Sequence, residues 1–363
     1  MKKMLLLSAL GALTLASCSQ DEPVMTGSET TSDYAIGFRP AMGPALSPLS
    51  RSTEITNANL SEINVTAFMG NSLYFPGLDF LKGTDGFFVS TPEYHWPGDD
   101  TELTFYAYAP TNPGGKVTID TDTKNMTGFS PAANVADQVD FITANASGNR
   151  SQNEASGVEL TFAHRLSQIE IRGKADNEVY TFKVSGVRIG QPVSEGSFDF
   201  TASDWTLGSD KAIYEETYDT PVTLTADDAT LMGSEGNAIL LPQQLTAWNP
   251  KTDTTNSAKG AYLSVRLQIE TTETGVTVYP FPSESGCQWA AIPISTNWEQ
   301  GKKYIYNLDF SHGAGYVDPN DPDPGIEVLG GPIKFTVDVE DWVDNPVDLP
   351  MDVTEQSDDT SSK

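Results

Sequence analysis

Apolar and polar residues alternate with a period of two along most of the chain. The clearest alternating segments are residues 63–67, 103–107, 158–162, 169–171, 180–184, 263–269, 304–310 and 333–339. Such alternation gives a strand one buried face and one solvated face, which is typical of antiparallel sheets. No long segment carries the apolar stripe of a helix, so the pattern predicts an all-β fold.

Glycine and proline residues lie mostly between these segments, where they mark turns. Many short strands over this length predict two antiparallel β-sandwich domains in tandem. The polar loop at residues 144–154 is the best linker candidate. We therefore expect an N-terminal domain at residues 34–155, a C-terminal domain at 156–345 and a tail at 346–363.

The N-terminus has the pattern of a lipoprotein signal. Lys2 and Lys3 precede a short apolar run that ends in Leu15-Ala16-Ser17-Cys18. This run is shorter than the roughly 20 residues that span a bilayer as a helix. We expect residues 1–17 to be removed and the Cys18 thiol to be acylated with fatty acids such as palmitate. A plain secreted protein with an incidental cysteine is the alternative interpretation.

The residues after Cys18 predict a tether at the cell surface. Residues 18–33 are small and polar, which is typical of a flexible linker. The acidic residues directly after Cys18 resemble the signal that displays some Gram-negative lipoproteins on the outer face of the outer membrane. The only other cysteine is Cys287. With Cys18 acylated, the fold must rest on packing without an intrachain disulfide.

The net charge and the motifs of the sequence exclude several classes of function. The formal net charge of -29 argues against nucleic acid and anionic lipid as partners. The three histidines are scattered, and no hydrolase, nucleotide or metal motif occurs. We therefore expect no enzyme activity, no cofactor and no metal site. The acidic loop Asp318–Asp323 offers oxygen ligands for calcium, but Pro322 occupies a ligand position of the EF-hand pattern, so a stiff loop is favoured.

Four local patterns stand out along the chain. They are an F-x-H-x-L-S core at residues 162–167, an L-P-Q strand end at 241–243, a W-x-x-G-x-x-Y-x-Y-x-L segment at 298–308 and a closing V-x-x-W strand at 339–342. Together they resemble segments of the fimbrillin family, the subunits of type V pili. The resemblance implies two transthyretin-like β-sandwich domains. It also implies that His164 is structural, because that motif lies within a strand.

In that family, an arginine-specific protease removes the N-terminal segment of the surface lipoprotein, and the vacated groove accepts a strand from another subunit. Here the candidate cleavage site lies between Arg51 and Ser52, in a turn-prone stretch. Tyr34, Ile36 and Phe38 alternate with polar or small residues and predict the first strand, which cleavage would displace. An ordinary loop arginine is the other interpretation of Arg51.

A candidate donor strand follows the last predicted strand of the C-terminal domain. Val347, Leu349, Met351 and Val353 alternate with polar residues and with Pro350, which suits an edge strand. A frayed polar terminus is the alternative. An attached strand has an effective concentration of about a millimolar or more, so the first strand is expected to hold the groove until the chain is cut.

These observations predict a surface lipoprotein that becomes a structural or tip subunit of a fimbrium and acts in adhesion. The partners would be other pilus subunits, the outer membrane through the lipid, and a host or bacterial receptor. The alternative is a glycan-binding lipoprotein of a polysaccharide-uptake system. That function would need several of the six tryptophans exposed in a row on one face.

Overall fold

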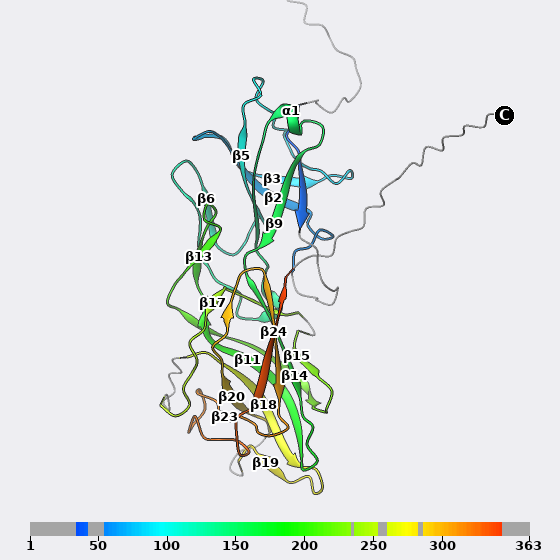
Figure 1. The fold of residues 1–363 in the computed structure, drawn as a ribbon, viewed down its shortest axis with the longest axis vertical. Coiled ribbons are helices and arrows are strands. Elements are labelled where there is room, and N and C mark those ends of the chain that lie inside the picture. The colour runs from blue at the N-terminus through cyan, green and yellow to red at the C-terminus, as the bar shows by residue number, and fades with distance from the viewer. Residues whose placement is uncertain (1–33, 43–53, 234–235, 253–259, 282–285, 343–363) are drawn as a thin grey trace, which may run out of the picture. The chain divides into compact units, whose positions relative to one another are not determined.

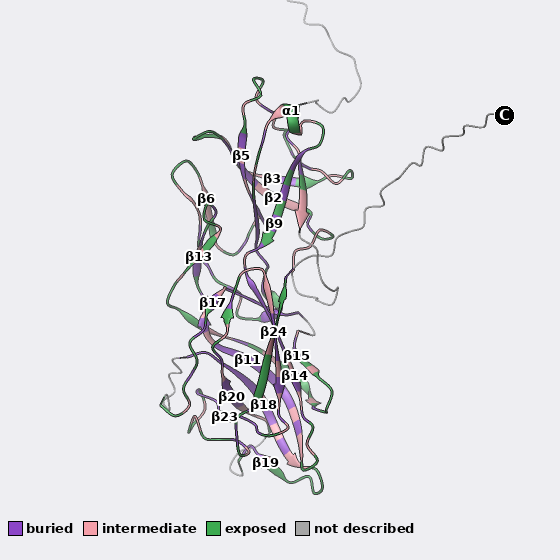
Figure 2. Ribbon diagram, in the orientation of Figure 1, coloured by how far each residue is buried: buried purple, intermediate pink, exposed green. Residues whose placement is uncertain are grey.

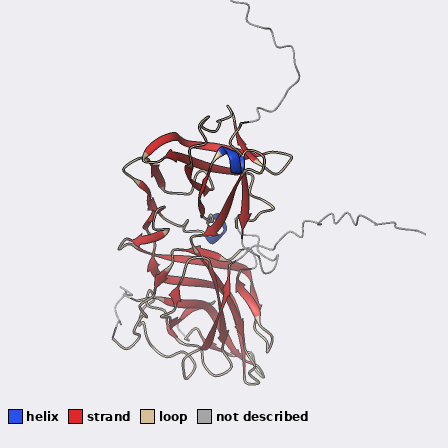
Figure 3. Ribbon diagram, turned by 45° about the horizontal axis from the view of Figure 1, so that its top comes forward, coloured by secondary structure: helices blue, strands red, loops and turns tan. Residues whose placement is uncertain are grey.

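The computed structural model describes residues 34–42, 54–233, 236–252, 260–281 and 286–342. Nearly all regular structure in these ranges is strand (Figure 3). The helices described are the 3₁₀ turn η1 (Val135–Asp137) and the single turn α1 (Arg150–Asn153). Across the described ranges, no helix has the length and apolar content needed to cross a bilayer. The all-β prediction is confirmed, and every alternating segment lies in or overlaps a strand.

The N-terminal strands pair around a closed barrel in the order β1-β4-β3-β2-β5-β8-β9. Figure 1 labels several of them. Their bounds are β1 (Phe38–Met42), β2 (Glu62–Met69), β3 (Ser72–Lys82), β4 (Phe88–Ser90), β5 (Leu103–Ala109), β8 (Ile142–Gly148) and β9 (Val158–His164).

Phenylalanine side chains fill the barrel interior. The fully buried rings are Phe38, Phe75, Phe80, Phe88 and Phe105. They come from β1, β3, β4 and β5, and each points inward from its strand. Aliphatic residues such as Val65 and Leu160 complete this core.

Two further sheets pack face to face around a second core. The first has the order β15-β10-β22-β24, with β16 also paired to β10, and the second has the order β14-β11-β18-β20-β23, with β19 paired to β18. The first contains β10 (Ser167–Lys174), β15 (Ala229–Met232), β16 (Ala238–Leu240), β22 (Lys302–Asp309) and β24 (Lys334–Asp341). The second contains β11 (Tyr180–Val193), β14 (Lys211–Thr223), β18 (Tyr262–Thr271), β19 (Thr277–Tyr279), β20 (Gln288–Pro293) and β23 (Tyr316–Val317).

The core between these sheets takes alternate residues from both. Ile169 and Tyr306 come from one sheet, and Phe182 and Leu263 come from the other. The central strands β10, β11 and β18 are largely buried, whereas β24 at the edge of its sheet is largely exposed (Figure 2).

Smaller sheets connect elements that the sequence places far apart. One has the order β13-β12-β7-β6, with β6 (Lys116–Ile119), β7 (Lys124–Phe129), β12 (Gly196–Asp199) and β13 (Asp204–Leu207). The other joins β17 (Gln243–Gln244) to β21 (Asn297–Trp298). Pairing therefore continues across residue 155: β7 joins β12, and β9 completes the barrel with β8 and β1. The division into two domains near that residue stays a prediction.

Most strand pairs are antiparallel, as the alternation predicts. Among the strands of the described ranges, two pairs are parallel: β1 with β9, and β10 with β22. Parallel neighbours cannot be joined by a tight hairpin, so long stretches of chain separate the partners in both pairs. The alternating pattern gives the buried face of a strand but not the identity of its neighbour, and these two pairs follow from the tertiary fold alone.

Candidate functional site

Strand β1 closes the barrel between β9 and β4. Its residues from Phe38 to Met42 pair with β9 in parallel, whereas only Phe38 pairs with β4. Just before the strand, the Ile36 N–H donates to the Tyr94 carbonyl at 2.7 Å. Without β1, strands β4 and β9 would be open edges.

The inward side chains of this segment lie in the barrel core. Phe38 is fully buried and meets the rings of Phe80 and Phe105 edge to face, at centroid distances of 4.9 and 5.0 Å. Ile36 is also buried, at 1% exposed. Burying such side chains stabilises a fold by roughly 1.5–3 kcal/mol each.

The first strand differs from its expected bounds. It was expected over Tyr34, Ile36 and Phe38, but the regular strand begins at Phe38. Tyr34 is 45% exposed, and its ring lies under the Arg150 guanidinium at 3.6 Å. Ile36 and Phe38 have the inward orientation that the alternation predicts. Whether the segment is displaced stays a prediction.

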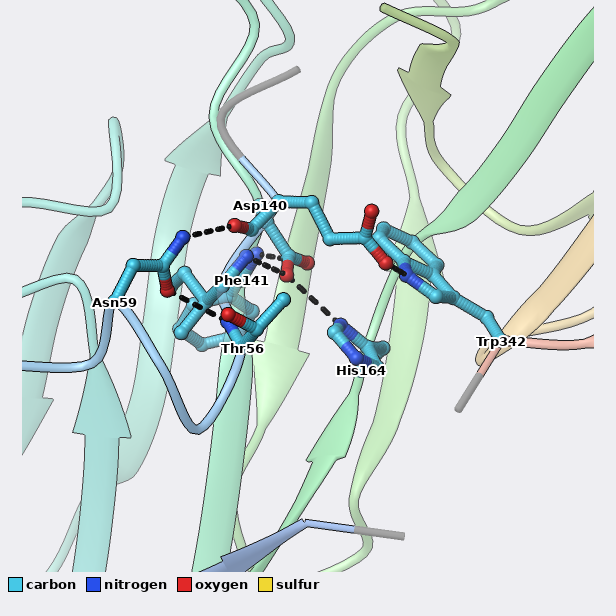
Figure 4. A network of polar contacts seen from close by, with 8 residues as sticks. Thr56, Asn59, Asp140, Phe141, His164 and Trp342 are labelled. Carbon is cyan, nitrogen blue, oxygen red and sulfur yellow. Dashed lines mark hydrogen bonds and ion pairs between the residues drawn. The ribbon is translucent and has the colours of Figure 1, made fainter. Parts of the chain in front are cut away.

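A buried carboxylate anchors the chain on the other side of the Arg51 stretch. The Asp140 carboxylate accepts hydrogen bonds from the Ile55 and Phe141 N–H groups at 3.1 and 2.7 Å (Figure 4). His164 Nδ1 lies 2.8 Å from the same carboxylate. Because a carboxylate only accepts, Nδ1 carries the proton here. Asp140 is 0% exposed, so these donors replace the water that the charge has lost.

Trp342 joins this network from the end of β24. Its indole ring stacks on the His164 ring with centroids 4.2 Å apart, and its Nε1 donates to the Glu54 carboxylate. Its backbone N–H donates to the Gly301 carbonyl at 2.8 Å. We call Glu54, Ile55, Asp140, His164 and Trp342 the junction. It connects the first described residues after the Arg51 stretch to Trp342, the last described residue of the C-terminal domain.

The junction brings together two of the motifs that the sequence singles out. His164 comes from the F-x-H-x-L-S core, and Trp342 closes the V-x-x-W strand. The structural role implied for His164 agrees with its burial and its bond to Asp140. Sequence reasoning missed Asp140 and Glu54, because nothing local distinguishes them among the 50 acidic residues of the chain.

The tryptophans do not form an exposed row. All six lie in the described ranges; Trp96, Trp248, Trp298 and Trp342 are buried, while Trp205 and Trp289 are half-buried. Trp205 Nε1 donates to the Arg165 carbonyl, and the Arg188 guanidinium covers Trp289 at 3.8 Å. The glycan-binding alternative therefore finds no support from these side chains.

The acidic loop is fastened to the sheet through its first aspartate. Asp318 is fully buried, and its carboxylate accepts bonds from the Asn320 backbone, the Asn320 side chain and the Ser264 hydroxyl. Arg188 Nε lies 3.6 Å from the same carboxylate. These contacts give Asp318 a structural role. Among the described residues, no group of three or more metal-ligating side chains comes together.

Several residues predicted to be functional lie outside the described ranges. They are Cys18, Arg51, Ser52, Val347, Leu349, Met351 and Val353. Their roles stay predictions. Cys287 is described and is a half-buried free thiol.

Comparison with known proteins identifies the family. A family model described as fimbrillin-like matches residues 51–342. A fimbrial protein from Bacteroides vulgatus has a similar fold, with a TM-score of 0.58 at 15% identity over 85% of this chain and 99% of that one. The fimbrial anchor protein Mfa2 from Porphyromonas gingivalis matches 86% of this chain and 98% of its own, with a TM-score of 0.37 and 12% identity. No curated protein sequence gives a significant match. Because the family model covers most of the sequence, the chain belongs to the fimbrillin-like family.

Proposed function

We propose that this chain is a structural or tip subunit of a type V pilus. It reaches the cell surface as a lipoprotein anchored through Cys18, is cut between Arg51 and Ser52, and then polymerises by strand exchange. Membership of the fimbrillin-like family supports the role of fimbrial subunit. The position of β1 in the barrel supports strand exchange as the mode of assembly.

One observation carries this proposal: β1 closes the barrel and is followed by the stretch that contains Arg51. Cutting that stretch turns β1 from an attached strand into a separate peptide. Its effective concentration then falls from about millimolar or more to the concentration of free peptide. A strand from another subunit can compete for the vacated place, which is lined by Phe80 and Phe105.

The contacts of the junction support a cleavage that releases the segment before Arg51 and leaves the segment after it bound. Ile55 is held by Asp140, and Asn59 donates to the Glu54 carbonyl at 2.7 Å. These bonds fasten the chain from Glu54 onward to the rest of the protein. Cleavage at Arg51 would therefore release the β1 side and leave the retained side in place.

The proposal is tested by comparing Arg51→Lys with Arg39→Lys. Lysine keeps the charge but is not a substrate of an arginine-specific protease. In cells that carry the protease, we expect Arg51→Lys to abolish polymers and to leave a full-length surface lipoprotein. Arg39→Lys makes the same chemical change at an exposed residue of β1 and should polymerise as the parent does. Normal polymers from Arg51→Lys would contradict cleavage at this site.

A further inference from the structure

We infer that the place vacated by β1 accepts the tail of a second copy of this chain in one register only. We call positions 34–42 the β1 slot. The register sets these replacements in the slot: Leu349 for Ile36, Pro350 for Gly37, Met351 for Phe38 and Val353 for Pro40. This inference rests on the proposed strand exchange and adds to it the alignment of donor and acceptor.

Backbone directions in the slot follow from the observed pairing. Phe38 is in register with Val158, and the Val158 N–H donates to the Gly37 carbonyl at 2.9 Å. In a parallel ladder, alternate residues direct both backbone groups at the partner. Positions 37, 39 and 41 therefore face β9, and positions 34, 36, 38 and 40 face the opposite side.

Pro40 already obeys this rule. It has no N–H, and it sits at a position whose nitrogen faces away from β9. On that side the neighbour is β4, which runs antiparallel and begins at Phe88, opposite Phe38. No β4 residue therefore lies opposite Pro40, and its missing N–H costs no hydrogen bond of the ladder.

Pro350 restricts where the tail can fit. When the apolar residues of the tail point inward, Pro350 falls on a position that faces β9. At positions 39 and 41 an N–H is needed for the ladder with β9, and a proline there would leave a buried carbonyl unpaired. Position 37 is different: between described residues, the Gly37 N–H donates no hydrogen bond.

Position 37 also has room for a side chain. A Cβ built on Gly37 would meet its nearest atoms, on Phe87 and Phe88, at 3.8 Å, which is ordinary van der Waals contact. The Gly37 φ lies outside the left-handed region. A proline moreover favours an extended residue before it, which suits the residue at position 36.

Inward side chains fit the slot in this register. Met351 would lie between the Phe80 and Phe105 rings, where a flexible thioether makes favourable contacts with aromatic edges. Leu349 would replace the similarly sized Ile36 and supply the N–H that donates to the Tyr94 carbonyl.

The competing register is shifted by two residues and places Leu349 at position 38. In this competing register Val353 occupies position 42, where the proposed register places Glu355. Pro350, however, then occupies position 39 and leaves the carbonyl of the buried Val158 without its N–H donor. Met42 is only half-buried, so an apolar residue there strengthens binding by a few-fold. The unpaired carbonyl lowers affinity by roughly tenfold or more, so the first register prevails.

The two registers are distinguished by engineered disulfides. In the proposed register Asp352 lies beside Glu159, and in the competing register it lies beside Thr161. Glu159 and Thr161 are both exposed, on the same face of β9. Directly paired residues have Cα atoms about 5 Å apart, whereas a shift by two residues separates them by about 8 Å, too far for a disulfide.

Each pair, Glu159→Cys with Asp352→Cys and Thr161→Cys with Asp352→Cys, is made in a Cys287→Ser background. We expect only the Glu159 pair to give polymers that resist dissociation until a reductant is added. Cross-linking through Thr161 instead would overturn the register but leave strand exchange intact. Polymers with neither cross-link would overturn the proposed exchange at the β1 slot.

A peptide measurement decides the case in which the cysteine variants do not polymerise. A peptide of residues 346–356 is titrated against subunit that has been cut at Arg51 and freed of its β1 fragment. We expect Met351→Ala to weaken binding at least tenfold and Pro350→Ala to change it by less than about threefold. Binding that tightens tenfold or more with Pro350→Ala would overturn the register, and a parent peptide that does not bind would overturn the exchange.

Discussion

Asp140 is a buried carboxylate whose charge is stabilised by hydrogen bonds from Ile55, Phe141 and His164. These bonds hold the junction together. One oxygen of the carboxylate accepts from Ile55 and His164 and the other accepts from Phe141, so asparagine keeps the shape but loses the charge and turns an amide N–H group toward donors on one of the two sides. Hydrogen bonds to a charged group contribute about 1.5–3 kcal/mol each. We therefore expect Asp140→Asn to lower the free energy of unfolding by about 3 kcal/mol.

Chemical denaturation measures this change, and Asp137→Asn is the matched control. Asp137 is exposed and accepts a bond from Asn134 at 3.1 Å. Its substitution should alter the free energy of unfolding by less than about 0.5 kcal/mol. Equal effects of the two substitutions would contradict the role given to Asp140.

Glu170 gives the fold a dependence on pH. Burial alone would raise the pKa of its carboxyl group, but hydrogen bonds and charge from Lys303 and Arg172 outweigh burial and lower the pKa below its ordinary value of 4.5. A carboxylate with a lowered folded pKa stabilises the fold above the unfolded pKa, and this contribution is lost as pH falls through the folded pKa.

We expect Glu170→Gln to lower the free energy of unfolding by about 2 kcal/mol at pH 7. The difference from the parent should shrink as pH falls from 4.5, the ordinary pKa of the carboxyl group, which applies to the unfolded chain, through the lowered pKa of the folded state. Urea denaturation at a series of pH values measures this, with the exposed Glu178→Gln as control. A difference that grows on acidification would contradict the direction of the shift.

Single residues of the junction were only partly predictable from the sequence. His164 and Trp342 belong to recognisable motifs, but their stacking depends on the end of β9 meeting the end of β24. Asp140 and Glu54 carry no local signal, because a buried acid and a solvated acid look alike in a sequence. Their roles come from burial and from donors contributed by distant segments.

At the scale of elements, β1 is held mainly by its inward side chains and its ladder to β9. We expect Phe38→Ala to lower the free energy of unfolding by about 3–5 kcal/mol, since it leaves a cavity between Phe80 and Phe105. Tyr34→Ala, which removes a ring exposed to solvent and its contact with Arg150, should cost less than about 1 kcal/mol. Thermal or denaturant unfolding of the uncut precursor compares the two.

This comparison also tests the placement of β1. If both substitutions cost little, β1 does not contribute to the barrel core. If Tyr34→Ala costs as much as Phe38→Ala, the inward face of the segment begins earlier than the structure places it.

Alternation predicted the strands more reliably than their partners. The period-two segments at residues 103–107 and 158–162 became β5 and β9, because turning every second residue inward is a local property. The parallel pairing of β1 with β9 depends on long-range closure of the barrel, which no local pattern encodes. The sheet of β6, β7, β12 and β13 was not predicted, because its strands are short and pair across the expected domain boundary.

At the scale of the whole molecule, β1 is a temporary part of the fold in the proposed assembly. In the proposed exchange, either β1 or a neighbour's tail supplies the strand between β4 and β9, and the covalent link through Arg51 decides which of the two is present. The proposal therefore has folding of the precursor and assembly of the fibre use the same place in the barrel, one after the other.

The fate of the β1 fragment tests this most directly. Purified fibres are denatured, and the intact masses of all their components are measured. We expect subunits that begin at Ser52, with no fragment containing Phe38 present in a stoichiometric amount. Fibres whose subunits are uncut at Arg51, or which retain the β1 fragment one to one with the subunit, would contradict it.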